Sequence, residues 1–371
     1  MIGKNDRISN FQMMILLVNT IIGVGTLSLP STLAMKLNTG GWILLLISGF
    51  LVSILAIIIT KLMQMYPGKT LVEIGRELIG IPLNNIIMAV FIIYLLGTSA
   101  FLVRIFAEVI KMFLLLNTPT EIIIITMLLT TSYIARCGIE PITRITLIIT
   151  PIVFIPLFFI AVILLQDVDF TNLLPLFRFS VTDVIKAIPA SFFSYGGFEF
   201  ILIYMAFIEK PKGAAKYNVF AIVIVAVSYI FMFIITLTSF GITVLKDQLW
   251  PLLSLMKTIE FPGAFIENVD GVVMAIWVLL VFTTLAPVLY MKALIMSKVF
   301  RLKEHKIFVL PLIPIVFILS LIPDNLVQVY KYMEIFIYFF GTFSSVIVPI
   351  VFYIIAIFKN KRGAHSNEQG A

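Results

Sequence analysis

Long apolar stretches recur along the chain, and short polar segments separate them. A helix needs about 20 mostly apolar residues to cross the roughly 30 Å hydrocarbon core of a membrane. Stretches of this kind cover residues 11–34, 40–65, 84–113, 119–135, 144–165, 185–208, 217–243, 269–292, 306–322 and 332–358. The pattern predicts an all-α integral membrane protein with ten transmembrane helices. Because the first stretch lacks a small-residue cleavage site, we expect it to be retained rather than removed as a signal peptide.

The composition agrees with a membrane as the solvent. Hydrophobic residues make up 61% of the 371 residues and charged residues 12%, whereas soluble chains are about half apolar and a quarter charged. One cysteine, Cys137, and two histidines, His305 and His365, leave little for a disulfide or a histidine-based metal site. The predicted spans show no paired aspartates, no serine–histidine arrangement and no metal-ligand spacing. We therefore predict no enzyme activity, no cofactor and no metal site.

Lysine and arginine are shared unevenly between the two sides of the predicted bundle. With ten spans both termini lie on one side, and that side carries 18 of these residues against seven on the other. The positive-inside rule then places both termini in the cytoplasm. The net charge of +7 thus marks orientation in the lipid, and nucleic acid is not predicted as a partner.

Three segments outside the spans have their own patterns. Residues 67–81 have apolar positions at helical spacing and predict a short interfacial helix. The outer loop 246–270 is apolar enough to lie on the protein or in the lipid headgroups. The end of the chain from Gly363 is polar, and we expect it to be disordered.

The first and sixth spans contain glycine clusters with polar neighbours, at residues 19–30 (NTIIGVGTLSLP) and 189–199 (PASFFSYGGFE). Glycine costs a helix about 1 kcal/mol and lets a ligand approach the backbone, so each cluster predicts a helix break. Unwound backbone at membrane depth persists only where it is buried in protein or lines a polar cavity. Broken helices at matching positions of two halves are typical of inverted-repeat transporters with a site between the halves. The alternative is that the glycines only let helices pack closely.

These breaks divide the chain into two repeats of five helices. The predicted parts are a cytoplasmic N-terminus (1–10), a first repeat (11–165), an extracytoplasmic loop (166–184), a second repeat (185–358) and a cytoplasmic tail (359–371).

The two breaks together predict an α-amino acid site. A half-helix that begins near Gly25 and Thr26 points free N–H groups at a carboxylate, and half-helices that end near Ile22 and Ser194 offer carbonyls to an ammonium group. The apolar neighbours indicate a small uncharged ligand side chain. The candidate ligand-binding residues are Ile22, Gly23, Val24, Gly25, Thr26, Ser194, Tyr195, Gly196, Gly197, Phe198, Glu199 and Tyr290.

Charged and hydroxyl side chains inside the spans are further candidates. Glu199 follows the second break, where a carboxylate contacts a ligand or proton, holds the broken backbone, or is simply satisfied by neighbouring amides. Arg104 and Glu108 are four residues apart, close enough for an ion pair, and either snorkel or line an outer vestibule. Thr283 and Thr284 could complete a sodium site with carbonyls of the first helix, or could bond back to their own helix.

Several of these segments resemble one family. The first cluster, the run from Ser194 to Glu199, and residues 266–270 (IENVD) ahead of Ile276 and Trp277 are similar to the spore germination permeases. These are the B subunits of nutrient germinant receptors, within the amino acid-polyamine-organocation transporter superfamily. The resemblance implies ten helices in a five-plus-five inverted repeat, a small nutrient ligand, and assembly with A and C subunits in the inner spore membrane.

Two functions remain open at this point. In the first, a nutrient occupies the cavity and shifts a two-state helix arrangement that partner subunits detect. In the second, the chain carries the same ligand across the membrane with a proton or a sodium ion.

Overall fold

The computed structural model describes residues 6–166, 168–176, 179–257 and 269–368, and these residues are almost entirely helical or in turns. Backbone pairing of the β type is confined, within these ranges, to one parallel bridge between Ile8 and Ile208. The helices are α1 (Asn10–Ile21), η1 (Val24–Thr26), α2 (Leu29–Leu37), η2 (Asn38–Gly40), α3 (Gly41–Met65), α4 (Leu71–Ile79), α5 (Ile81–Phe113), α6 (Thr120–Cys137), α7 (Ile139–Leu164), η3 (Phe170–Leu173), α8 (Val181–Phe192), η4 (Phe193–Tyr195), η5 (Phe198–Phe200), α9 (Ile201–Tyr204), η6 (Met205–Phe207), α10 (Ala214–Asp247), α11 (Pro251–Met256), α12 (Val269–Val299), α13 (Lys306–Leu321), α14 (Leu326–Phe336), η7 (Ile337–Ile347) and α15 (Val348–Glu368).

Seven helical segments of the described chain are long and apolar enough to cross a membrane. The bent pair from Val181 to Phe207 makes an eighth if it is one span, and α1 and α13 are apolar but shorter. The count of ten therefore stays a prediction. In the first predicted span, the break after Ile21 leaves only the 12 residues of α1 on one side.

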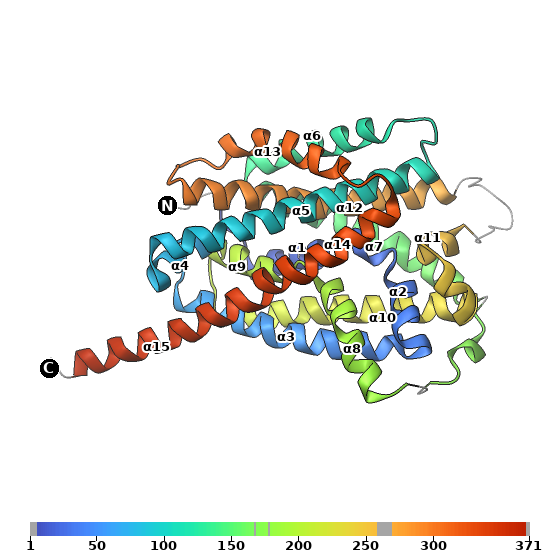
Figure 1. The fold of residues 1–371 in the computed structure, drawn as a ribbon, viewed down its shortest axis with the longest axis horizontal. Coiled ribbons are helices and arrows are strands. Elements are labelled where there is room, and N and C mark those ends of the chain that lie inside the picture. The colour runs from blue at the N-terminus through green and yellow to red at the C-terminus, as the bar shows by residue number, and fades with distance from the viewer. Residues whose placement is uncertain (1–5, 167, 177–178, 258–268, 369–371) are drawn as a thin grey trace.

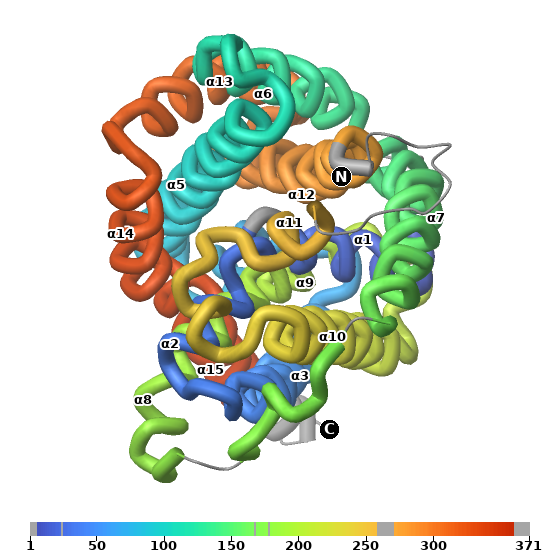
Figure 2. Tube along the Cα trace, turned by 90° about the vertical axis from the view of Figure 1, so that its right-hand side faces the viewer, coloured from blue at the N-terminus to red at the C-terminus, as the bar shows by residue number. Residues whose placement is uncertain are grey.

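The long helices form two groups with the broken segments between them. Figure 1 shows α5 and α12 side by side, with α6 and α13 against them, and α3 and α10 together on the other side of α1 and α9. The end view in Figure 2 shows α1 and α9 in the middle, enclosed by α5, α12, α7, α10 and α3. The two short helices next to the glycine clusters thus occupy the centre of the molecule.

Local sequence signals set several helix ends. Ser9 and Gln12 form a capping box at the start of α1, and Thr70 and Glu73 form another at the start of α4. Helix α4 lies within the predicted interfacial segment 67–81. Between α10 and α12, α11 packs on the protein, since Leu253 and Met256 are buried. Residues 258–268, which include residues 266–268 of the family motif, lie outside the described residues.

Two expectations about helix ends are wrong. Helix α15 continues to Glu368, where a disordered polar end was expected. Helix α12 continues to Val299, seven residues beyond the predicted end at 292. Lys292 is one of the 18 lysine and arginine residues that the sequence analysis assigns to the cytoplasmic side. It lies inside α12 instead and is fully buried.

Candidate functional site

The first glycine cluster interrupts the helix at the centre of the bundle. Helix α1 ends at Ile21, a single 3-10 turn follows at Val24–Thr26, and α2 begins at Leu29. The Thr26 hydroxyl donates to the Gly23 carbonyl at 2.7 Å, and the Gly23 N–H donates to the Ile21 carbonyl at 2.8 Å. The unwound segment is thus held by its own short-range hydrogen bonds.

The second cluster interrupts the chain in the same way. Helix α8 passes into the turn Phe193–Tyr195, and the helical backbone resumes at Phe198 after a bend of 51°. Gly197 has φ of 114°, a left-handed conformation that L-residues other than glycine rarely adopt. This position explains why a glycine stands directly before the second half-helix.

The two breaks touch each other. A Cβ atom built on Gly197 would lie 3.2 Å from the Thr20 carbonyl oxygen and 3.3 Å from Cγ1 of Ile21. A Cβ contact this short would force its neighbours to shift, so the absence of a side chain at Gly197 favours the close approach of the two segments. The structure therefore brings together the two segments that the sequence placed at one site.

Tyr229 of α10 bridges both breaks, and the sequence reading missed it. Its hydroxyl lies 2.9 Å from the Ile21 carbonyl oxygen and 3.0 Å from the Ser194 carbonyl oxygen. One hydroxyl carries one proton, so the two carbonyls share this donor, and the Ile21 carbonyl also accepts from the Gly23 N–H. The Ser194 carbonyl therefore keeps more acceptor capacity than the Ile21 carbonyl. A tyrosine in the middle of a long apolar span is the signal that could have identified it.

Replacing Tyr229 with phenylalanine should lower the free energy of unfolding by about 1–3 kcal/mol, because the Ser194 carbonyl loses this donor and the Ile21 carbonyl keeps only the Gly23 N–H. Thermal unfolding of the purified chain in detergent measures this loss. Tyr217→Phe is the matched control, since Tyr217 lies on the same helix and is exposed. Equal losses in the two variants would contradict the bridging role.

Glu199 holds the second break and links it to α5. The side chain is buried; Oε1 accepts from the Tyr94 hydroxyl at 2.8 Å and Oε2 accepts from the Gly197 N–H at 2.9 Å. Both oxygens are therefore engaged with protein donors, and a carboxylate at the start of a half-helix also matches the helix dipole. Tyr94 is a second residue that the sequence reading missed.

Thr283 and Thr284 of α12 contact α1 at Asn19, just before the first break. The Thr284 hydroxyl lies 3.0 Å from the Asn19 carbonyl oxygen and 3.1 Å from the Leu280 carbonyl oxygen. The Thr283 hydroxyl also donates to Leu280, at 2.8 Å. Both threonines thus bond back to their own helix, while oxygen atoms of α1 and α12 converge as a cation site requires.

An apolar pocket borders the first break. Its lining includes Ile22, Thr26, Phe154, Trp277 and Leu280, and the other lining residues are apolar as well. A Cβ atom built on Gly25 meets nothing within 4 Å, so open space lies beside this glycine too. A ligand that reached the breaks would find exposed backbone and an apolar wall.

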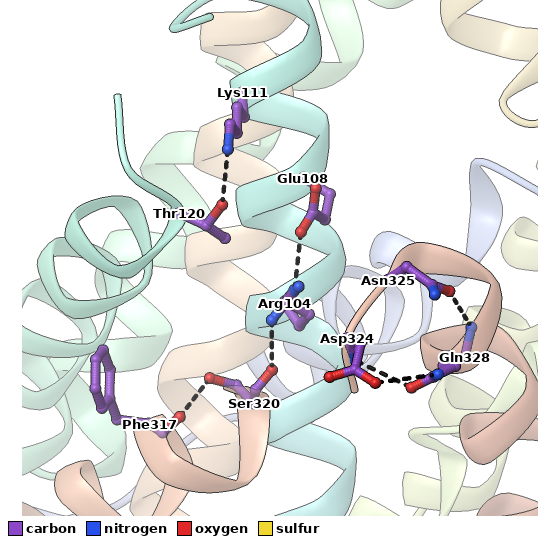
Figure 3. A network of polar contacts seen from close by, with 9 residues as sticks. All are labelled: Arg104, Glu108, Lys111, Thr120, Phe317, Ser320, Asp324, Asn325 and Gln328. Carbon is purple, nitrogen blue, oxygen red and sulfur yellow. Dashed lines mark hydrogen bonds and ion pairs between the residues drawn. The ribbon is translucent and has the colours of Figure 1, made fainter. Parts of the chain in front are cut away.

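Three of the candidate residues lie away from the breaks. Figure 3 shows Arg104 between Glu108 of the same helix and Ser320 of α13, and its Nε donates to Glu108 at 2.9 Å while its Nη1 donates to the Ser320 carbonyl at 3.2 Å. Tyr290 packs on Phe207 and His305, about 9 Å along α12 from Thr284. These contacts fasten neighbouring segments and do not adjoin the two glycine clusters.

Residues 7–329 match the family described as spore germination protein. The chain is similar to spore germination protein YndE of Bacillus subtilis (strain 168), at 32% identity over 98% of this chain and 99% of the relative. It is also similar to spore germination protein A2 of the same strain, at 29% identity over 95% of this chain and 96% of the relative. These matches span nearly the whole chain.

A solved structure shares the fold. The crystal structure of MhsT in complex with L-phenylalanine has a TM-score of 0.66, covering 96% of this chain and 99% of MhsT. Sequence identity is 15%, so this likeness concerns the fold alone.

Proposed function

Since this chain belongs to the spore germination permease family, we propose that it is the nutrient-sensing membrane subunit of a spore germinant receptor. A small amino-acid-like germinant binds at the two broken helices and triggers germination by a conformational change. The observation that carries the proposal is the contact between the breaks at Gly197 and Thr20, together with the open space at Gly25. The fold neighbour MhsT is itself a complex with an amino acid, L-phenylalanine, which supports a ligand of this class.

Each part of an amino acid has a suitable partner. The ligand carboxylate approaches the backbone of Gly25 and Thr26 at the start of the second half-helix. The ligand ammonium group takes the carbonyls of Ser194 and Ile21, which share the Tyr229 hydroxyl as a donor, while Ile21 also accepts from the Gly23 N–H. The ligand side chain enters the apolar pocket, whose walls favour a small uncharged group.

Signalling follows from a difference in ligand affinity between two helix arrangements. Both termini lie in the cytoplasm, the chain spans the inner spore membrane, and A and C subunits detect the change. The two halves around the breaks, residues 11–165 and 185–358, move relative to each other.

Replacing Gly25 with leucine should abolish nutrient-triggered germination. The added side chain enters open space, so the chain still folds while the ligand space is filled. We expect at least about a tenfold loss of response, equivalent to 1.4 kcal/mol of ligand binding. Spores carrying the variant are tested against the twenty amino acids and common nutrient sugars and nucleosides, with the amount of subunit measured in their membranes.

Gly271→Leu is the matched control, because a Cβ at Gly271 also meets nothing within 4 Å and this glycine lies outside the breaks. The control spores should respond normally. A normal response of the Gly25→Leu spores, at normal subunit amounts, would overturn the proposed binding site.

A proton- or sodium-coupled carrier is the second candidate, and the oxygen atoms of Asn19, Leu280 and Thr284 support it. Uptake of labelled amino acids into proteoliposomes, with and without sodium and pH gradients, distinguishes it from a sensor. Gradient-driven uptake that Thr284→Val abolishes would establish the carrier.

A further inference from the structure

Lys292 is a fully buried amine between two long helices. It lies on α12, and its Nζ donates to the Ser99 hydroxyl of α5 at 2.6 Å. Along α12 it is eight residues from Thr284, or about 12 Å. An ionisable side chain inside a membrane span is costly, and its presence there indicates a function.

The hydrogen bonding at Lys292 is incomplete for a charged group. The Ser99 hydroxyl donates its own proton to the Leu95 carbonyl at 2.7 Å, so it faces Lys292 as an acceptor. An ammonium group has three N–H donors, and within the described part of the chain this hydroxyl is the one acceptor in hydrogen-bond contact. None of the ion pairs in that part includes Lys292.

Among the described residues, the helices that pack against α12 supply no charged or titratable residue that compensates the charge of a protonated Lys292. Each such residue is held by a partner of its own or is exposed, and α1 and α11 carry none. They are Glu73, Arg76 and Glu77 of α4, Tyr94, Arg104, Glu108 and Lys111 of α5, Glu121, Tyr133, Arg136 and Cys137 of α6, Glu140 and Arg144 of α7, and Lys306 of α13.

We propose that Lys292 is a proton-binding site whose loading changes how α5 and α12 pack. The lone pair of the amine takes a proton from hydronium and releases water, and the resulting ammonium needs acceptors that this arrangement does not supply. A proton needs no cavity, which suits an amine in direct contact with Ser99. This inference does not depend on the nutrient site.

Both helices also reach the broken segments. Helix α5 carries Tyr94, which donates to Glu199 at the second break. Helix α12 carries Thr284, whose hydroxyl lies 3.0 Å from the Asn19 carbonyl oxygen before the first break. A change in the packing of α5 on α12 therefore alters the contacts of both breaks. Proton binding at Lys292 thereby changes the contacts of the two breaks at the centre of the molecule.

The full chain in lipid nanodiscs, carbon-13 labelled at lysine Cε, provides the direct test. The Lys292 signal is the one missing from Lys292→Met, and we expect it to shift with pH in one step. In Ser99→Ala the midpoint should move by at least about one pH unit, because a hydrogen bond to a charged group is lost. A signal that does not change with pH, or an unmoved midpoint in Ser99→Ala, would refute the proposal.

Hydrogen–deuterium exchange tests the conformational part. Protection factors, which compare each exchange rate with the intrinsic amide rate at the same pH, should depend on pH in α5 and α12. We expect this in the unmodified chain and in Lys298→Met, a control on the same helix whose amine pairs with Glu73 at 3.1 Å. Lys292→Met should remove this pH dependence, and its persistence there would exclude the coupling. The midpoint of the Lys292 signal is also measured with added chloride or acetate at constant ionic strength. If it moves, the ligand of Lys292 is an anion, and the proposed proton site is wrong.

Discussion

Replacing Gly197 with alanine should destabilise the protein by about 2–5 kcal/mol and abolish the response to nutrients. The left-handed backbone costs an alanine about 1–2 kcal/mol. The new Cβ, 3.2 Å from the Thr20 carbonyl oxygen and 3.3 Å from Ile21 Cγ1, adds an overpacking cost of about 1–3 kcal/mol. Relief of this contact separates the two breaks, so the site loses its geometry together with its stability. Thermal unfolding in detergent and germination of spores with the variant measure the two effects.

Gly213→Ala separates the cost of a positive φ from the cost of the close contact at Gly197. Gly213 also has a positive φ, of 86°, but a Cβ there meets nothing within 4 Å. Its alanine variant should lose about 1–2 kcal/mol and retain the nutrient response. An equal loss in the free energy of unfolding of Gly197→Ala and Gly213→Ala would contradict the close contact between the two breaks.

The glycines show how far the sequence could predict the site. Gly23 and Gly197 identify the breaks because helix propensity and backbone access are local properties. That the breaks touch is a property of the packed bundle. Tyr229 and Tyr94 were missed because the groups they bond, the carbonyls of Ile21 and Ser194 and the carboxylate of Glu199, lie on other helices.

The end of α12 beyond Lys292 is another feature that could not be predicted from the local sequence. The apolar stretch 269–292 predicts a span that ends at this lysine. The actual end is fixed by a distant residue: Arg76 of α4 donates to the carbonyls of Lys298 and Val299, each at 2.9 Å. A capped last turn carries α12 beyond the lysine and leaves its amine inside the bundle.

Two substitutions distinguish the roles of Glu199, because glutamine can accept a hydrogen bond at this position and alanine cannot. Glu199→Ala leaves the Gly197 N–H and the Tyr94 hydroxyl buried without an acceptor. Each costs about 1–3 kcal/mol, so we expect a loss of about 2–6 kcal/mol and no nutrient response. Unfolding of the purified variant and germination of spores that carry it are the measurements.

Glu199→Gln should behave differently, because the amide can rebuild both contacts. Its oxygen accepts from the Gly197 N–H, and its nitrogen donates to the Tyr94 oxygen once that hydroxyl turns. The loss should be about 1 kcal/mol, since charge-assisted hydrogen bonds are roughly twice as strong as neutral ones. If the carboxylate serves to hold the backbone, these spores still germinate. A glutamine variant that is stable but unresponsive would instead assign the negative charge to the ligand ammonium group, and the acceptors at the breaks would then include Glu199 as well as the carbonyls.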